Sequence, residues 1–194
     1  MTARNPTPLP DGDREGTRSM GTTLMLVASA MMFGALLLLY YLLRVEAPEW
    51  PPAASRPLPR GLATLATVIL FASSLTLEIG VRELRRARLE RLATWIGATL
   101  ALGFAFFFSI AFLWFELIQG GFESRNPHGG LFYVITAVHG AHLITALGLL
   151  IWLFLGARRR RFHGRRGVPV RLVGRFWHFL GVAWLLVYLT LFWS

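Results

Sequence analysis

The chain has 194 residues, of which 55% are hydrophobic and only 15% are charged. This composition is typical of a polytopic membrane protein and excludes an ordinary soluble domain. Cysteine is absent, which excludes disulfides and thiolate metal sites. All 20 basic residues are arginines, and the formal net charge is +10. Because arginines of membrane proteins gather in inward-facing loops, their distribution decides whether this charge indicates nucleic acid or a membrane.

The chain divides into a polar tail and a membrane domain. Residues 1–19 contain three prolines and mix acidic with basic side chains, so we expect a flexible tail. Residues 20–194 contain five apolar stretches, each long enough to cross a hydrocarbon core of roughly 30 Å as a helix. The expected spans are about residues 20–43, 61–80, 92–118, 129–156 and 176–193. The sequence therefore predicts an all-α integral membrane protein, a bundle of five transmembrane helices.

The connections between the spans differ strongly in charge. Residues 44–60 contain five prolines, which break helices, and only three arginines. Because successive spans alternate sides, 16 arginines fall on the side of the N-terminus and four on the other side. The positive-inside rule then places the N-terminus in the cytoplasm and the C-terminus outside. For the run Arg158, Arg159, Arg160 and Arg161, which directly follows a span, we expect lipid headgroups rather than nucleic acid as the partner.

Several side chains fall near the expected membrane surfaces. Glu78 and Arg82, four residues apart at the inner end of the second span, predict an ion pair at a helix end. Tryptophans at both surfaces are typical of interfacial aromatic belts, with Trp50, Trp114 and Trp193 outside and Trp95 and Trp177 inside.

The fourth span carries two histidines near its middle, His139 and His142. Their spacing places both imidazoles on one helical face, and an ionisable group at this depth must face protein, water or headgroups. One interpretation is a metal or haem site, for which His178 on the fifth span is the other intramembrane candidate, although it falls nearer the inner surface. The second is a structural pair, hydrogen-bonded to a carboxylate, a backbone carbonyl or a lipid phosphate on a neighbouring helix. Glu116 on the third span is the expected carboxylate, because a short connection favours antiparallel neighbours; a proton relay through Glu116 is the third interpretation.

Residue chemistry alone shows no nucleotide-binding loop and no nucleophile constellation. It therefore favours an accessory or assembly subunit. A small membrane cytochrome that uses the histidines, and a transporter that uses Glu116, stay open as alternatives.

Motifs in the last two expected spans resemble subunit III of the haem-copper terminal oxidases, the cytochrome c oxidase subunit III family. The family pattern of an aromatic pair followed by T-x-x-H-G-x-H is matched by Phe132-Tyr133, Thr136, His139-Gly140 and His142. The pattern W-H-F, then W, Y and W, is matched by Trp177-His178-Phe179, Trp184, Tyr188 and Trp193. Further similarities are Glu116 and the triplet Trp50-Pro51-Pro52. The sequence departs from the family at two places, where Ala30 and Gly181 replace its usual acids.

The resemblance implies a non-catalytic accessory subunit III of a respiratory haem-copper oxidase, in the short five-helix form, in the inner (plasma) membrane of a bacterium. Haem and copper are then expected in partner chains and not in this one. Subunit I, and with it subunit II, are the expected protein partners. The chain is expected to bind phospholipid and to support the proton uptake and durability of the dioxygen-reducing complex. The departures leave open a subunit III-like component of a quinol oxidase or nitric oxide reductase complex.

On the same resemblance, the polar side chains have structural roles. Glu116, His139, His142 and His178 are expected to make structural polar contacts, and Arg158 to Arg161 to hold lipid headgroups.

Overall fold

The computed structural model describes residues 11–50, 58–122, 126–159 and 167–193. Within these ranges the long elements are five α-helices: α1 (Asp11–Glu46), α2 (Arg60–Arg85), α3 (Leu89–Gln119), α4 (Pro127–Arg158) and α5 (Val168–Phe192). Each of the five is long and apolar enough to cross a membrane. The predicted all-α bundle of five membrane-spanning helices is therefore confirmed.

The helices are longer than the spans expected from hydropathy. The largest differences are at α1, which begins at Asp11 rather than near residue 20, and at α5, which begins at Val168 rather than near residue 176. Residues 11–19, expected in a flexible tail, are thus helical. Hydropathy marks only the part of a helix in contact with lipid tails, and nothing in the flanking sequence stops these helices. Pro169 stands in the first turn of α5, where its missing N–H costs no hydrogen bond.

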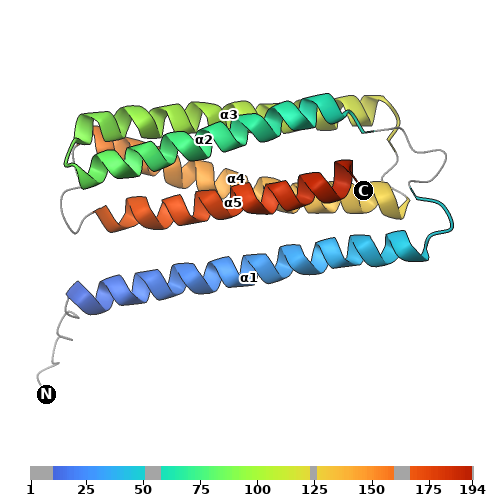
Figure 1. Cartoon of the computed structure of the whole chain (residues 1–194), viewed down its shortest axis with the longest axis horizontal. Helices are drawn as coiled ribbons and strands as arrows, with labels where there is room; N and C mark the ends of the chain where they lie inside the picture. The colour runs from blue at the N-terminus through green and yellow to red at the C-terminus, as the bar shows by residue number, and fades with distance from the viewer. Residues whose placement is uncertain (1–10, 51–57, 123–125, 160–166, 194) are drawn as a thin grey trace, which may run out of the picture.

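Four of the helices form a closed ring. α2 packs on α3, α3 on α4, α4 on α5, and α5 on α2, while α1 lies outside this ring and packs mainly on α4 and α5 (Figure 1). In the most apolar window of α5, 56% of the residues are buried, against 17% in α1. The last helix is therefore the centre of the bundle, and the first is at its edge.

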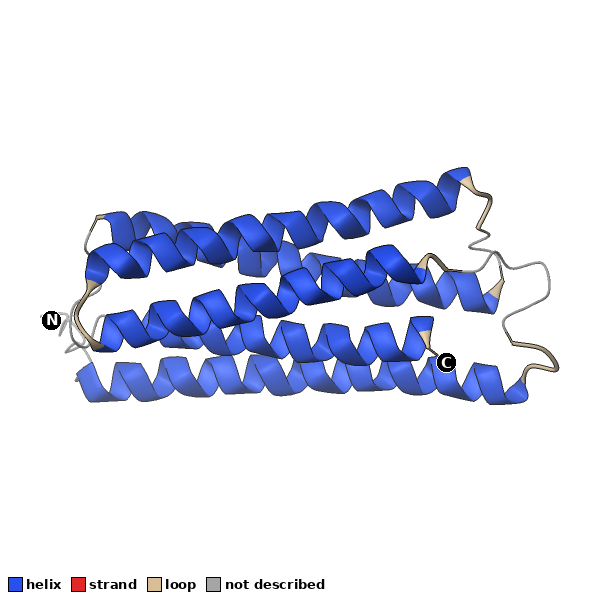
Figure 2. Cartoon of the chain, turned by 45° about the horizontal axis from the view of Figure 1, so that its top comes forward, coloured by secondary structure: helices blue, strands red, loops and turns tan. Residues whose placement is uncertain are grey.

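The two ends of the bundle differ in charge. The starts of α1, α3 and α5 lie at the same end as the terminations of α2 and α4 (Figures 1 and 2). Arginines gather there in the described residues, at the α2–α3 turn, at the end of α4 and at the start of α5. We call this the arginine-rich end. Arg44 and Arg60 lie at the opposite end, so the helix arrangement reproduces the charge asymmetry expected from the sequence.

Hydrogen bonds between side chains join α2 to α5 and so close the ring of four helices. The indole N–H of Trp177 donates to the hydroxyl of Ser73 at 3.1 Å, and that of Trp184 donates to the hydroxyl of Thr67 at 2.9 Å. The hydroxyls of Thr64 and Tyr188 lie 2.7 Å apart. Trp177 is fully buried, so its expected place in an interfacial aromatic belt is wrong. Its indole packs inside the bundle because α5 is surrounded by other helices.

The helices α2 and α3 end in the same backbone motif. After α2, the N–H of Arg88 bonds the carbonyl of Glu83 and that of Ala87 bonds Leu84, both at 3.0 Å. After α3, the N–H of Phe122 bonds Leu117 at 2.9 Å and that of Gly121 bonds Ile118 at 3.1 Å. This pattern is the Schellman motif, which needs one residue in the left-handed conformation. The residues that adopt it are Ala87, with φ 57°, and Gly121, with φ 74°.

Candidate functional site: buried histidines and charged helix ends

His139 lies inside the bundle, surrounded by aromatic rings. Its side chain contacts Phe33 of α1, Phe106 of α3 and Trp184 of α5, with ring centroids 6.1, 6.0 and 5.1 Å away. The residue is 2% exposed, and within the described residues neither ring nitrogen has a hydrogen-bond partner. His139 therefore acts as a packing ring at the place where four helices meet, in contrast to the hydrogen-bonded role expected from the sequence.

His142 joins α4 to α1. Its Nδ1 lies 2.8 Å from the carbonyl oxygen of Val138, one turn earlier on the same helix, and its Nε2 lies 3.3 Å from the hydroxyl of Ser29. A carbonyl only accepts, so Nδ1 carries the proton, and in the neutral ring Nε2 accepts from Ser29. The backbone carbonyl considered from the sequence was one on a neighbouring helix, whereas Val138 belongs to α4 itself. Ser29 was missed as a partner, because no signal in the sequence places α1 against α4.

Glu116 does not contact the histidines. It is exposed and lines a cavity of about 560 Å³ together with Phe112, Phe115 and Pro59, near the start of α2. The α3 residue that meets His139 is Phe106, ten residues earlier, which is about 15 Å along the helix axis. The expected pairing of Glu116 with His139 or His142 is therefore wrong, because residues judged to share the outer half of the membrane lie at different depths.

Within the described residues, His178 of α5 lies beside Glu78 of α2. Its Nε2 is 4.0 Å from a carboxylate oxygen of Glu78, which forms the predicted ion pair with Arg82 at 3.3 Å. The pair between Glu78 and Arg82 confirms the expectation from their spacing. Among the described residues, no three His, Cys, Asp or Glu side chains come together as a metal site would require.

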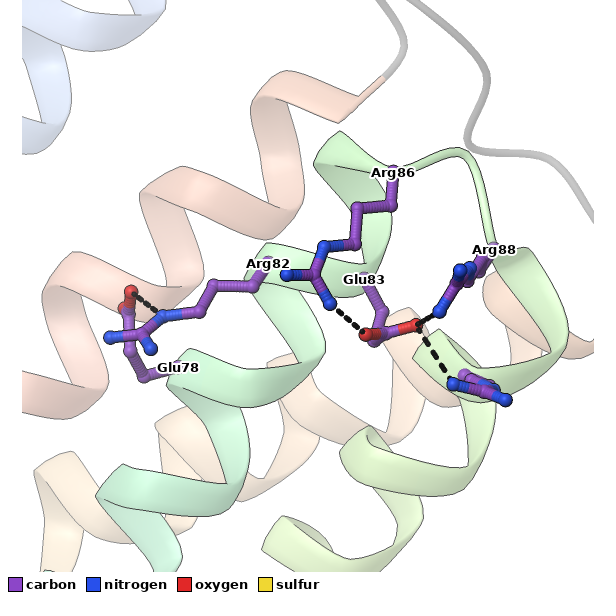
Figure 3. Close-up of polar contacts among 6 residues, drawn as sticks. Glu78, Arg82, Glu83, Arg86 and Arg88 are labelled. Carbon is purple, nitrogen blue, oxygen red and sulfur yellow. Dashed lines mark hydrogen bonds and ion pairs between the residues drawn. The ribbon is translucent and has the colours of Figure 1, made fainter.

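Glu83 forms a second charged cluster, which sequence analysis missed. Its carboxylate is buried, and the guanidinium nitrogens of Arg86, Arg88 and Arg91 lie 3.3, 3.8 and 4.0 Å from its oxygens. Figure 3 shows Arg86 and Arg88 directed at this carboxylate, beside the separate pair of Glu78 and Arg82. The sequence offered one signal, the acidic residues Glu83 and Glu90 inside a run of arginines.

The arginine run after α4 is only partly described. Arg158 and Arg159 are exposed at the end of α4, and the guanidinium of Arg158 lies over the ring of Phe154 at 5.8 Å. Arg160 and Arg161 fall outside the described residues.

At the opposite end, an aromatic cluster joins three chain segments. The indole N–H of Trp50 donates to the hydroxyl of Tyr40 at 3.2 Å, and the Trp50 ring meets His128 edge to face at 5.0 Å. Phe122, just after α3, packs on the same imidazole at 5.8 Å. Trp50 belongs to the family-like triplet, whose two prolines lie outside the described residues. The cluster fixes the ends of α1 and α3 to the start of α4.

Comparison with known proteins decides the family. Residues 14–194 match the sequence model of the family described as cytochrome c oxidase subunit III. This chain belongs to that family. The resemblance inferred from the two motifs is thus confirmed, and the chain is an accessory subunit III of a haem-copper oxidase.

Curated relatives support the assignment over nearly the whole chain. A protein of Nocardia farcinica named "Probable cytochrome c oxidase subunit 3" is 28% identical over 93% of this chain and 89% of its own length. A cytochrome c oxidase subunit 3 of Synechocystis is 28% identical over 90% of this chain and 75% of its own length. One of Thermostichus vulcanus is 27% identical over 90% of this chain and 86% of its own length. Family and helices together make the chain a multi-pass protein of a bacterial plasma membrane and one component of an oxidase complex.

Proposed function

We propose that this subunit III packs on the catalytic subunit I, with subunit II as a further partner, and sustains proton uptake and the durability of the complex through many turnovers. Haem and copper are carried by the partner chains. The observation that carries this proposal is the use made of the motif histidines. His142 spends both ring nitrogens on contacts that hold α1 to α4, and His139 is enclosed by three aromatic rings. Side chains packed in this way hold neighbouring helices together.

Lipid is the second partner in this proposal. Large apolar side chains are exposed along α1, among them Met31, Leu38 and Tyr41 at 58–71%. Within a membrane, such a face is covered by acyl chains or by another subunit. At the arginine-rich end, the exposed Arg158 and Arg159 extend where headgroups lie, and the neighbouring Arg160 and Arg161 are assigned the same role. This end faces the cytoplasm in our proposal, in keeping with the positive-inside rule.

The test uses the whole complex. The tagged chain is purified from native membranes in mild detergent, and a reduced-minus-oxidised optical spectrum is recorded before and after it is stripped from its partners. We expect haem bands and a large polytopic partner to co-purify, and the stripped chain to be colourless. A haem spectrum that stays with the stripped chain would overturn the proposal and favour a small membrane cytochrome. Deleting the chain is expected to leave an oxidase whose initial rate is normal and whose activity then decays during turnover.

A further inference from the structure

Glu83 is a buried carboxylate approached by more positive charge than it can neutralise. Three guanidinium groups lie within 4.0 Å of its oxygens, yet only that of Arg86 forms a hydrogen bond with it, at 3.3 Å. The second carboxylate oxygen has no hydrogen-bond partner in the described part of the chain. Glu90, exposed in the first turn of α3, adds a second carboxylate to this turn, so the three guanidinium groups exceed the carboxylates by one positive charge. The buried carboxylate of Glu83 therefore holds the cluster from beneath, and the cluster keeps a net positive charge on its exposed side.

The three arginines are held in place by the backbone that carries them. Arg86 caps the end of α2, Arg88 belongs to the turn, and Arg91 lies in the first turn of α3. The Schellman bond from the N–H of Arg88 to the carbonyl of Glu83 ties the turn to the residue whose carboxylate lies at the centre of the cluster. Because Arg88 and Arg91 are three positions apart, both project from the same side of the start of α3. The cluster is thus a rigid feature of the turn.

The outer faces of these guanidinium groups are open. The side chains of Arg86, Arg88 and Arg91 are 64, 53 and 65% exposed, whereas that of Glu83 is 7% exposed. An arginine carries five N–H donors in a planar fork that matches the geometry of a phosphate, and Glu83 uses few of them. The turn lies where α2 and α3 leave their apolar stretches, which is the depth of phospholipid headgroups in a membrane.

From this geometry we propose that Arg86, Arg88 and Arg91 bind the phosphate of one anionic phospholipid, above the buried carboxylate of Glu83. The phosphate supplies negative charge to the positively charged cluster. Its oxygens accept hydrogen bonds from the guanidinium N–H groups that do not bond Glu83. The inference rests on the lipid-binding part of the proposed function and goes further by naming the residues and the class of headgroup. Arg82 is excluded from the site, because its charge is already neutralised by Glu78 at 3.3 Å.

The test measures lipid retained by the oxidase complex. The complex containing the full chain is delipidated and titrated with phosphatidylglycerol, and bound lipid is counted by native mass spectrometry. Arg88→Gln and Arg91→Gln are each expected to weaken one phosphatidylglycerol site about fivefold, the usual contribution of one arginine at an anionic membrane surface. Arg82→Gln removes the same charge from the neighbouring turn of α2 and is expected to leave that site unchanged.

Two further arms identify the source of the phosphate. Phosphatidylcholine, whose ammonium group cancels its phosphate charge, is expected to bind the site more weakly than phosphatidylglycerol. Inorganic phosphate at millimolar concentration is expected not to displace phosphatidylglycerol. Equal effects of the Arg82, Arg88 and Arg91 variants would overturn the proposal, as would displacement by inorganic phosphate. So would loss of partner subunits with unchanged lipid in the Arg88 variant, since the cluster would then be a protein contact. Unchanged haem bands and subunit content in each variant keep a failure here distinct from a failure of the proposed function.

Discussion

Ala87 and Gly121 occupy the same position of the same motif, one after α2 and the other after α3. Both adopt the left-handed conformation, with φ values of 57° and 74°. That conformation costs a residue with a Cβ atom about 1–2 kcal/mol, and glycine almost nothing. A Cβ at Gly121 would meet no atom within 4 Å. The cost of alanine at this position therefore comes from the backbone conformation and not from a steric clash. The α2–α3 turn therefore carries a strain that the end of α3 avoids.

Exchanging the two residue types should change stability in opposite directions. Ala87→Gly is expected to raise the free energy of unfolding by up to about 1 kcal/mol, because the strain is relieved, less the greater freedom of glycine in the unfolded chain. Gly121→Ala should lower it by about 1 kcal/mol. Both are measured by unfolding the chain from mild detergent with sodium dodecyl sulfate. A change of the same sign in the two variants would contradict the strain assigned to Ala87.

The hydrogen bond between Ser29 and His142 should be visible as an energetic coupling. In a double-mutant cycle of Ser29→Ala and His142→Ala, we expect a coupling of about 0.5–1.5 kcal/mol, the usual contribution of one hydrogen bond. His139 lies on the same face of α4 but forms no hydrogen bond within the described residues. A cycle of Ser29→Ala and His139→Ala is thus the matched control, and its coupling should be close to zero. Equal couplings in the two cycles would mean that the contact at 3.3 Å contributes no specific energy.

At the scale of helices, Gly103 sets how closely α3 approaches α4 and α5. A Cβ at this position would lie 2.7 Å from the Trp177 ring and 2.9 Å from a methyl group of Leu147. Gly103→Ala is expected to destabilise the bundle by about 1–3 kcal/mol, the usual cost of overpacking a core. Gly148 on α4 has no atom within 4 Å of its Cβ position, so Gly148→Ala should be neutral or slightly stabilising. The readout is again unfolding in detergent, and equal losses in both variants would argue against close packing at Gly103.

The existence of the helices could be predicted from the sequence, but their bounds and contacts could not. Apolar stretches of 18 or more residues identify spans because lipid excludes unpaired backbone groups. Hydropathy carries no signal for a helix that continues into water, so the expected spans leave out the helical residues at the starts of α1 and α5. Glu116 was misplaced because it lies near the end of α3, whereas His139 lies near the middle of α4 and meets Phe106 of α3.

The spacing of the motif histidines identified them as important residues. It did not predict which side chains surround them. The rings around His139 come from α1, α3 and α5, which are distant in sequence, so no local pattern brings them together. The Glu83 cluster was missed because its arginines were counted as loop charge. Its acidic centre becomes evident only when the turn after α2 folds the chain back on itself.

At the scale of the whole molecule, the orientation in the membrane can be tested directly. Because the chain has no cysteine, a single introduced cysteine is the only site of the chain that a maleimide can label. Arg85 lies at the arginine-rich end and Glu49 at the opposite end, and both side chains are exposed. The two variants are Arg85→Cys and Glu49→Cys. In intact spheroplasts, a membrane-impermeant maleimide is expected to label the Glu49 variant and to label the Arg85 variant only after lysis. The reverse pattern would place the arginine-rich end outside, against the positive-inside rule.

The central place of α5 has a consequence for biogenesis. During synthesis α5 leaves the ribosome after α1, α2 and α4, on which it packs, and its tryptophans provide the indole N–H groups that bond Ser73 and Thr67 of α2. Until then the core of the bundle is incomplete. The hydroxyl groups of Ser73 and Thr67 lack their indole donors, and the ring of His139 lacks its contact with Trp184. Membrane chaperones and proteases would encounter the chain in this interval. We therefore expect a chain that stops before α5 to be degraded faster in the membrane than the full chain.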